Sequence, residues 1–238
     1  MSEFIKLSRS TVERFLTCKR CCVLEKKYQI RPPSLPFTLN IAVDNLCKNE
    51  FDYYRERQEQ HPLFKENKID AIPFKHKKID IWRSNFQGLR YRSIVNNYDF
   101  GGAIDDVWQK NNGDLIVVDV KATSKNIFNW EETFNKYEYA KGYKRQLEMY
   151  QWLFKKNGFS VSDEAYLVYF NARKNEDFFH NKLQFDVHFI KLICSTNWVE
   201  EKILETVSLL RSNVFPEPAK NCEYCNYLRK RWELSKQN

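Results

Sequence analysis

Two short segments rich in β-branched and aromatic side chains, AIDDVWQ (residues 103–109) and LIVVDVKA (residues 115–122), are separated by the polar stretch KNNGD. Such segments are typical of strands, and the intervening residues are typical of a turn. The pattern predicts a hairpin in which Asn111, Asn112 and Gly113 form the loop, with Gly113 in the left-handed backbone region. Lys110 then pairs with Asp114.

Counting outward from this loop places Asp105 opposite Asp119. Because side chains alternate along a strand, Asp105, Asp119 and Lys121 share one face, whereas Val118 and Val120 point into a core. Two carboxylates at roughly 5 Å repel each other unless a positive group lies between them. A divalent cation such as Mg²⁺ would remove the repulsion, and the lysine could reach the same centre. A half-solvated hairpin whose charges face water is the alternative.

Apolar positions at helical or strand spacing predict the other elements of the chain. Helices are expected over residues 8–28, 38–58, 143–158 and 195–212, strands over 164–170 and 182–190, and a polar loop over 124–142. The apolar face of the second helix is expected to carry Ile41, Leu46, Phe51 and Tyr54. This order predicts an α/β (α+β) fold with a mixed central sheet flanked by helices.

The domain prediction is a single domain over residues 1–238. It comprises N-terminal helices (1–60), an insertion of unclear structure (61–100), a core (101–195), and a C-terminal helix with a cysteine tail (196–238). A hydrophobic content of 42% is that of a folded protein. The chain lacks an apolar run of roughly 20 residues and an apolar N-terminal signal segment, so we expect a cytoplasmic protein without membrane association. The net charge of +8 suits nucleic acid, although solubility explains it equally well.

The stretches GAIDDVW, VVDVKAT and RQLEMYQW resemble motifs of the PD-(D/E)XK nuclease superfamily. They are most similar to the RecB-type branch, which includes the CRISPR-associated iron–sulfur exonucleases and the AddB nuclease domain. The resemblance implies a restriction-endonuclease-like fold that uses Mg²⁺ or Mn²⁺. It assigns catalytic roles to Asp105, Asp119, Lys121, Gln146 and Tyr150.

The same resemblance makes Asp105, Asp119 and the carbonyl of Val120 metal ligands, while Lys121 orients the attacking water or stabilises charge on the phosphate. Gln146 and Tyr150 share a helix face and would position the lysine or touch the DNA backbone. A core tyrosine beside an incidental glutamine is the alternative for that pair.

The family usually carries a further histidine ligand on its first long helix, and LNIAVDNLCKNEFD has none. Asp44 stands at the corresponding position, where an oxygen ligand is chemically reasonable for Mg²⁺ or Mn²⁺. Glu50 is the second choice, and a solvated helix face is the alternative for both.

Seven cysteines without an export signal favour metal binding or free thiols over disulfides. Two CxxC pairs, Cys18 with Cys21 and Cys222 with Cys225, have the spacing of a four-thiolate site that would join the chain ends. In the related nucleases one N-terminal and three C-terminal cysteines hold a [4Fe–4S] cluster, and this sequence departs from that pattern. A [4Fe–4S] cluster, structural Zn²⁺ and no metal therefore stay open. Cys22 is a less well-spaced substitute ligand.

Residues 74–93 interleave basic and aromatic side chains, which suits single-stranded DNA. The predicted nucleic-acid-binding residues are Lys77, Lys78, Trp82, Arg83, Arg90 and Arg92. A solvated face with core aromatics is the alternative.

These features predict a metal-dependent DNA nuclease, specifically an exonuclease acting on single-stranded ends or flaps in repair, recombination or CRISPR-type defence. DNA is the expected partner, and a protein partner in a DNA-processing complex is compatible with this prediction. A catalytically inactive nuclease-fold DNA-binding or scaffold subunit is the first alternative. A four-cysteine adaptor or redox sensor is the second.

Overall fold

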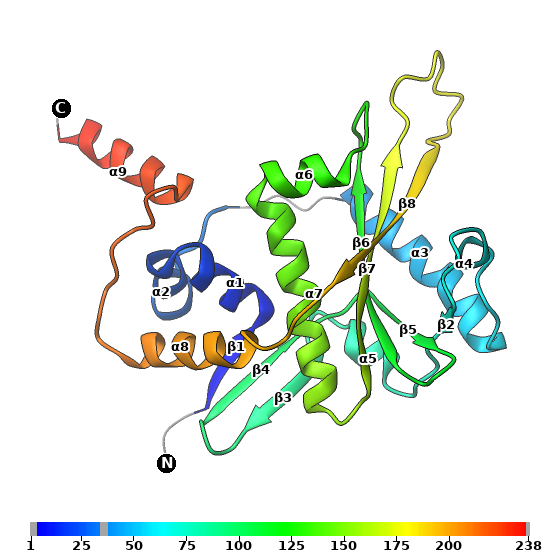
Figure 1. The fold of residues 1–238 in the computed structure, drawn as a ribbon. Coiled ribbons are helices and arrows are strands. Elements are labelled where there is room, and N and C mark those ends of the chain that lie inside the picture. Colours follow the sequence, from blue (N-terminus) through cyan, green and yellow to red (C-terminus); the bar gives the residue numbers. More distant parts are fainter. Residues whose placement is uncertain (1–3, 34–37, 237–238) are drawn as a thin grey trace. The chain divides into compact units, whose positions relative to one another are not determined.

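The computed structural model describes residues 4–33 and 38–236 (Figure 1). The chain divides into two compact units. The larger unit contains residues 37–91 and 102–196, and the smaller unit contains residues 1–36, 92–101 and 197–238. Within the described residues, no helix is both long and apolar enough to cross a membrane.

The larger unit contains a five-stranded sheet with the order β2-β5-β6-β7-β8. These strands are β2 (Ala71–Pro73), β5 (Asp106–Lys110), β6 (Leu115–Thr123), β7 (Val161–Ala172) and β8 (Phe185–Ile193). Only the pairing of β6 with β7 is parallel, and the chain crosses between them through α6 (Trp130–Lys136) and α7 (Glu138–Lys156). The mixed sheet confirms the predicted fold class.

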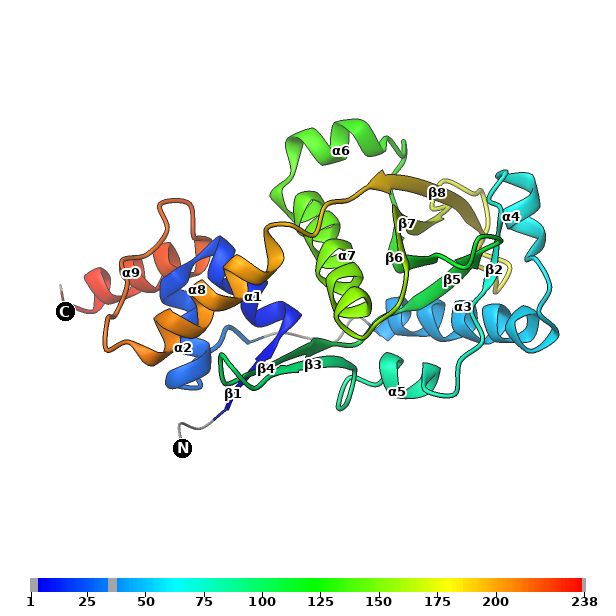
Figure 2. The same cartoon turned by 60° about the horizontal axis from the view of Figure 1, so that its bottom comes forward.

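Helices cover both faces of this sheet (Figure 2). On one face, α3 (Thr38–Arg57) contributes Cys47 and Phe51 to an apolar core that also contains Val118 and Val120 of β6. On the other face, α7 packs against β6 and β7. The short helices α4 (Pro62–Glu66) and α5 (Ile79–Arg83) complete the unit. The sheet therefore presents alternate residues of β6 to an apolar core and to α7.

The hairpin register agrees with the prediction. Asp106 lies opposite Val118, and the Lys110 N–H donates to the carbonyl of Asp114 at 2.9 Å. Gly113 has a φ of +90°, the left-handed conformation that such a loop requires of its last residue. Turn chemistry thus sets which residues of β6 face which side.

The smaller unit is mainly helical, with α1 (Arg9–Thr17), α2 (Lys19–Lys27), α8 (Val199–Arg211) and α9 (Glu223–Ser235). β1 (Ile5–Ser8) and residues 98–101 of β4 (Tyr98–Gly102) also belong to this unit; they lie in a three-stranded sheet with the order β1-β4-β3, whose third strand, β3 (Leu89–Ser93), begins in residues of the larger unit. β1 runs parallel to β4. The chain thereby brings its two ends into one unit.

Three predicted elements differ from the structure. The single helix over residues 8–28 is two helices, because Cys18 has extended backbone angles of −160° and 107°. The polar loop over 124–142 contains α6 and the start of α7, and the Asn129 side chain caps α6 by accepting from the N–H of Glu132. In α3, the predicted apolar residues Ile41 and Leu46 are exposed. The four-residue spacing of Val43, Cys47 and Phe51 defines its buried face instead.

Residues 61–100, the predicted insertion of unclear structure, carry α4, β2, α5, β3 and the start of β4. Of the proline-containing connection that precedes α3, residues 34–37 lie outside the described residues.

Candidate active site and four-cysteine cluster

Asp119 is the centre of the candidate active site. Its side chain is fully buried on the α7 side of β6, and its Oδ1 accepts a hydrogen bond of 2.7 Å from Nε2 of Gln146. The same amide nitrogen lies 3.5 Å from the hydroxyl of Tyr150, one helical turn further along α7. The structure therefore brings together three of the predicted catalytic residues.

Lys121 lies two residues further along β6 and forms an ion pair with Oδ2 of Asp119. Its Nζ also lies 3.3 Å from the carbonyl of Val120, which it contacts as a donor. The ammonium group thus faces the carboxylate oxygen and the backbone carbonyl that the family resemblance makes metal ligands. A positive charge is favoured at that point.

Asp105 precedes β5 and approaches β6 from the neighbouring strand. Its Oδ2 accepts from the N–H of Val120 at 2.8 Å. Asp44 on α3 lies close enough for the charges of Asp105 and Lys121 to affect its pKa. One Asp44 oxygen, Oδ2, binds Lys48 at 2.6 Å, whereas the buried Oδ1 has no hydrogen-bond partner.

The alternative ligand Glu50 is used elsewhere. Its Oε1 lies 2.9 Å from Nε2 of buried His61. Of the two predicted candidate ligands on α3, Asp44 is the one whose charge interacts with the candidate site.

The pKa values in the site reflect burial and crowding of like charges. Burial raises the pKa of Asp119 to about 7; the Lys121 charge opposes this rise and the Asp105 charge adds to it. Burial would lower the pKa of Lys121, but the charges of Asp119 and Asp105 raise it, so the ammonium stays charged. Burial and the charge of Asp105 raise the pKa of Asp44. An added cation would therefore favour the charged forms of Asp119 and Asp44.

The oxygen atoms of this site are of the chemical type that suits a divalent metal ion. Carboxylates of Asp44, Asp105 and Asp119 and the carbonyl of Val120 are hard donors of the kind that Mg²⁺ and Mn²⁺ prefer. The unpartnered Oδ1 of Asp44 is a buried acceptor that a cation would satisfy. An ion here would take over part of the role that the Lys121 ammonium has in the structure.

A buried charge network lies directly behind Asp105, and sequence reasoning missed it. Asp106 is fully buried and pairs with Arg55 at 2.6 Å and with Arg83 at 3.1 Å. Both arginines also bind Asp52, with the Arg55 pair at 2.9 Å and the Arg83 pair at 2.8 Å. Nε of Arg83 donates to the carbonyl of Asp105 at 3.1 Å. The network thus ties α3 and α5 to the backbone that carries Asp105.

The predicted nucleic-acid-binding residues fall into two groups. Trp82 is only 4% exposed, stacks on His76 and packs against Phe159, while Arg83 is held by its carboxylate partners. In the structure these two side chains therefore serve packing and ion pairing. Lys77, Lys78 and Arg92 are exposed, and Arg90 is half-buried.

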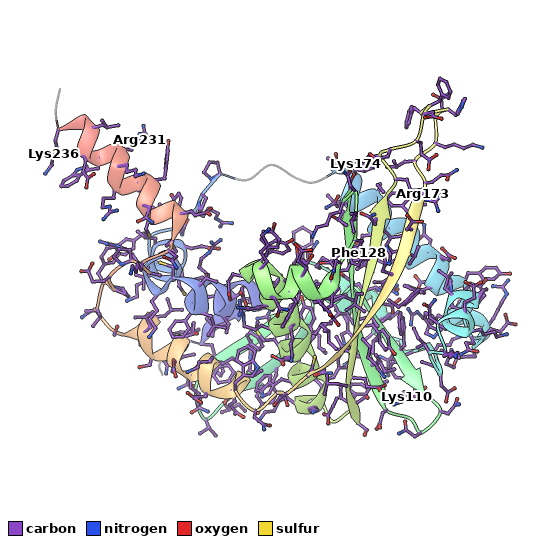
Figure 3. All side chains as sticks on the ribbon, turned by 45° about the horizontal axis from the view of Figure 1, so that its top comes forward. Lys110, Phe128, Arg173, Lys174, Arg231 and Lys236 are labelled. Atoms are coloured by element: carbon purple, nitrogen blue, oxygen red, sulfur yellow. The ribbon has the colours of Figure 1, made fainter. Side chains whose placement is uncertain are left out.

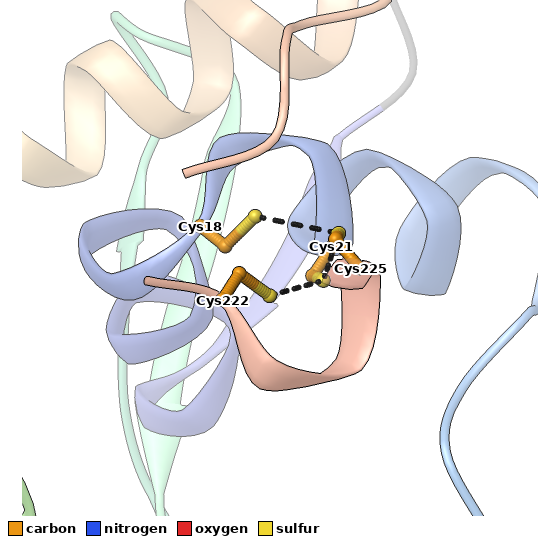
Figure 4. A group of neighbouring side chains, drawn as sticks. All are labelled: Cys18, Cys21, Cys222 and Cys225. Carbon is orange, nitrogen blue, oxygen red and sulfur yellow. Dashed lines mark hydrogen bonds between the residues drawn. The ribbon is translucent and has the colours of Figure 1, made fainter. Parts of the chain in front are cut away.

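The second predicted site is the four-cysteine cluster in the smaller unit (Figure 4). Sγ of Cys21 lies 3.5 Å from Sγ of Cys222 and 3.4 Å from Sγ of Cys225, and Cys18 and Cys225 are 3.9 Å apart. All four sulfur atoms lie within 4.8 Å of one another. Among the described residues, this is the one group of three or more ligand side chains gathered in this way.

The break between α1 and α2 places the first pair of sulfurs. The extended backbone of Cys18 ends α1, and α2 begins at the next residue, so Cys21 lies in the first turn of a new helix. Cys22 points elsewhere, with its Sγ 3.7 Å from the carbonyl of Thr11. Cys47 and Cys194 are buried separately, as small apolar side chains often are.

The cysteine pKa values are shifted in different directions within the cluster. Burial raises the pKa of Cys21 and of Cys225, the latter to about 11. At Cys18 burial also acts to raise the pKa, but the backbone N–H groups of Ala219 and Cys21 outweigh it and lower the value to about 7. Binding a metal would therefore release thiol protons.

The four sulfur atoms lie close enough together to be ligands of one metal site. Four bonds of 2.3 Å in tetrahedral geometry place the sulfurs about 3.8 Å apart. In a [4Fe–4S] cluster each thiolate binds a different iron atom, which spreads the sulfurs further. Three of the six sulfur–sulfur separations are 3.4–3.9 Å, and the other three are at most 4.8 Å.

Residues 42–229 match the family model of the PD-(D/E)XK nuclease superfamily. The chain belongs to this superfamily. The match extends from α3 through the acidic hairpin and α7 into α9, so it contains the candidate active site and the second cysteine pair. PD-(D/E)XK nucleases use divalent metals.

Comparison with solved structures finds similar proteins at low sequence identity. The crystal structure of SSO0001 is 16% identical, with a TM-score of 0.45, and the alignment covers 96% of this chain and 86% of the other. A protein from Eubacterium rectale described as a candidate exonuclease is 14% identical, with a TM-score of 0.46 and coverages of 93% and 87%. No match was found among curated proteins.

Proposed function

We propose that this PD-(D/E)XK protein is a metal-dependent DNA nuclease that hydrolyses phosphodiester bonds. More specifically, we propose an exonuclease that acts on single-stranded ends or flaps. The observation that supports this best is the convergence of Lys121 and Gln146 on Asp119, beside the carboxylate of Asp105, with the Tyr150 hydroxyl against the Gln146 amide. A buried carboxylate beside a second carboxylate destabilises a fold, so a protein without catalytic function would gain nothing from this pair.

Each residue has a distinct role in the proposal. Asp105, Asp119, the Val120 carbonyl and Asp44 would hold Mg²⁺ or Mn²⁺, which would activate water and neutralise charge on the phosphate. Lys121 would orient the attacking water and stabilise charge that develops on a phosphate oxygen. Gln146 would fix the Asp119 carboxylate.

The test is cleavage of end-labelled single-stranded and duplex DNA with Mn²⁺, Mg²⁺ or EDTA. We expect wild type to cut only with a metal, and Asp119→Ala to lose about 100- to 1,000-fold in rate. Asp163→Ala removes a largely exposed carboxylate on β7 and serves as the matched control, with wild-type activity expected. Product lengths would show whether cleavage starts from an end.

The alternative function is a catalytically inactive DNA-binding or scaffold subunit. Its support is Asp44, which stands where the family usually has a histidine. If wild type binds DNA but cuts nothing with either metal, this alternative replaces the nuclease. Restoration of cutting by Asp44→His would then identify the reason.

For the cysteines we propose a structural site that holds one tetrahedral ion such as Zn²⁺, and the sulfur spacing supports this choice over the [4Fe–4S] cluster of the related nucleases. Metal analysis of freshly purified protein should find about one zinc per chain and no broad visible absorption. A brown preparation that contains iron and inorganic sulfide would overturn the assignment.

A further inference from the structure

A row of tyrosines runs along α7 toward the candidate active site. Tyr139, Tyr143, Gln146 and Tyr150 follow one another at intervals of three or four residues and therefore share one face of the helix. Gln146 donates to Asp119 and lies beside the Tyr150 hydroxyl, and the Tyr143 ring centroid lies 4.9 Å from Nζ of Lys121. The rings of Tyr139 and Tyr143 are 5.6 Å apart.

The outer end of this row is open to solvent. Tyr137, just before α7, stacks on Tyr139 with ring centroids 5.3 Å apart and an angle of 23° between the ring planes. The two side chains are 40% and 46% exposed. Core packing explains tyrosines with buried rings, and it leaves these exposed, stacked rings without a role. We call Tyr137, Tyr139 and Tyr143 the tyrosine stripe.

Lysines flank the exposed end of the stripe. Nζ of Lys125 and of Lys136 lie 5.7 Å and 5.4 Å from the ring centroid of Tyr137. A hollow of about 350 Å³ beside it is lined by Lys125, Tyr137 and Lys174, among others. Arg173 and Lys174 follow the end of β7, where the chain leaves the sheet (Figure 3). Aromatic rings and cationic groups therefore lie together on this surface, and Glu132 also lines the hollow.

We propose that the tyrosine stripe binds a single strand of DNA by stacking on its bases, while Lys125 and Lys136 neutralise its phosphates. Aromatic rings in a basic groove are the common means of holding unpaired bases without reading their sequence. The stripe ends at Lys121, so a strand bound along it would deliver a phosphodiester to the catalytic residues. This last step rests on the proposed nuclease function.

The structure favours this surface over residues 74–93 because Trp82 of that segment is buried, whereas the stripe exposes its rings. The test measures binding of a fluorescent 12-nucleotide oligothymidylate, of an abasic strand of equal length and of a blunt duplex. All measurements are made without added Mg²⁺ or Mn²⁺, so that no cleavage occurs and the metal of the cysteine site is kept. The variants are Tyr139→Ala, Tyr139→Phe, which keeps the ring, and Tyr53→Ala, which removes an exposed tyrosine on α3.

We expect Tyr139→Ala to weaken oligothymidylate binding by about fivefold to a hundredfold, since that is the usual contribution of one base stacked on one ring. Tyr139→Phe and Tyr53→Ala should bind it like wild type. The abasic strand and the duplex should bind equally to wild type and to all variants.

The inference is overturned if Tyr139→Ala binds oligothymidylate like wild type, or if it loses the abasic strand to the same extent. Because the assay contains no added Mg²⁺ or Mn²⁺, its result is independent of catalysis. A wild type that cleaves DNA while Tyr139→Ala binds normally would contradict the stripe alone. A wild type that never cleaves but shows base-dependent binding at Tyr139 would contradict the nuclease alone.

Discussion

The candidate active site of the larger unit and the four-cysteine cluster of the smaller unit both gather several ligand side chains, but they do so in opposite ways. The active site combines oxygen donors from α3, β6 and the start of β5, and Asp105 and Lys121 are half-buried. The cysteine cluster combines four sulfur donors, three of which are buried. The active-site ligands are hard oxygen donors that are partly open to solvent, whereas the cysteine ligands are soft sulfur donors that are mostly buried.

This difference separates chemistry from architecture. Four thiolates fill the coordination sphere of a tetrahedral ion, so no position is left for a reactant. Carboxylates around Mg²⁺ or Mn²⁺ leave positions for water and phosphate oxygens. Changes at the cysteines should therefore affect stability first, and changes at the carboxylates should affect turnover first.

The largest effect is expected at the cysteines. Cys21→Ser removes one of four thiolates, and structural sites of this kind contribute about 10–16 kcal/mol of apparent folding free energy at neutral pH. The bound metal should be lost, and amide exchange should accelerate in α1, α2, α8 and α9. Mass spectrometry measures both.

Cys22→Ser, one residue along the same helix, is the matched control and should keep its metal. Unchanged exchange in those four helices after metal removal would contradict a structural role.

The next largest effect is expected at Asp106. Asp106→Asn leaves Arg55 and Arg83 buried with one counter-charge fewer, which should lower the free energy of unfolding by about 3–5 kcal/mol. Urea denaturation measures the change, with Asp163→Asn as an exposed control that should stay within about 0.5 kcal/mol of wild type. A loss of less than about 1 kcal/mol would show that the network contributes little.

Lys121→Met tests the active site without removing a metal ligand. The neutral side chain cannot stabilise charge on the phosphate, so cleavage should slow by about 100- to 1,000-fold while DNA binding is kept. Lys191→Met, which removes an exposed lysine on β8, is the control. Equal losses of rate and binding in Lys121→Met would mean that the lysine only attracts DNA.

The smallest effect is a pH dependence of metal affinity. The pKa of Asp119 is about 7, so below that pH a proton competes with the metal. Lys121 stays charged because its pKa is raised, so it adds no second transition to the pH dependence of metal affinity. Calorimetric Mn²⁺ affinity should fall about tenfold per unit below pH 7 and level off above it. Equal affinity at pH 6 and pH 8 would contradict this.

The raised pKa of Asp119 also makes the stability of the metal-free protein depend on pH, in the opposite direction to metal affinity. The folded pKa of Asp119 exceeds its ordinary value of 3.8, so the folded state holds the proton more tightly than the unfolded chain. Stability in EDTA should therefore be highest below pH 4 for this group and should decline as the pH rises toward 7. Asp119→Asn should remove the decline.

Local chemistry made part of the molecule predictable. The loop around Gly113 sets the hairpin register, and the register sets which acids share a face with Lys121. The CxxC spacing likewise predicted the cysteine cluster. These features depend on residues that are near in sequence or on a pairing rule that fixes partners at a distance.

Other features depend on contacts that spacing does not encode. Nothing local separates exposed Leu46 from buried Cys47 on α3, because only packing against β6 decides between them. The burial of Trp82 follows from His76 and Phe159, and the role of Arg83 follows from Asp52 and Asp106. The role of Asp106 was not predicted. Adjacent strand residues face opposite sides, so only one of Asp105 and Asp106 could be assigned to the metal, and the sequence names no partner for the other.

The position of the cysteine pairs has a consequence for the order of events during protein synthesis. The residues of the larger unit are complete once Thr196 has left the ribosome, and they include every catalytic residue proposed above. The smaller unit joins Cys21 to Cys222 and Cys225, about 200 positions later in the chain. A nascent chain can therefore fold its catalytic unit first, and Cys18 and Cys21 remain free thiols until Cys222 and Cys225 have been synthesised.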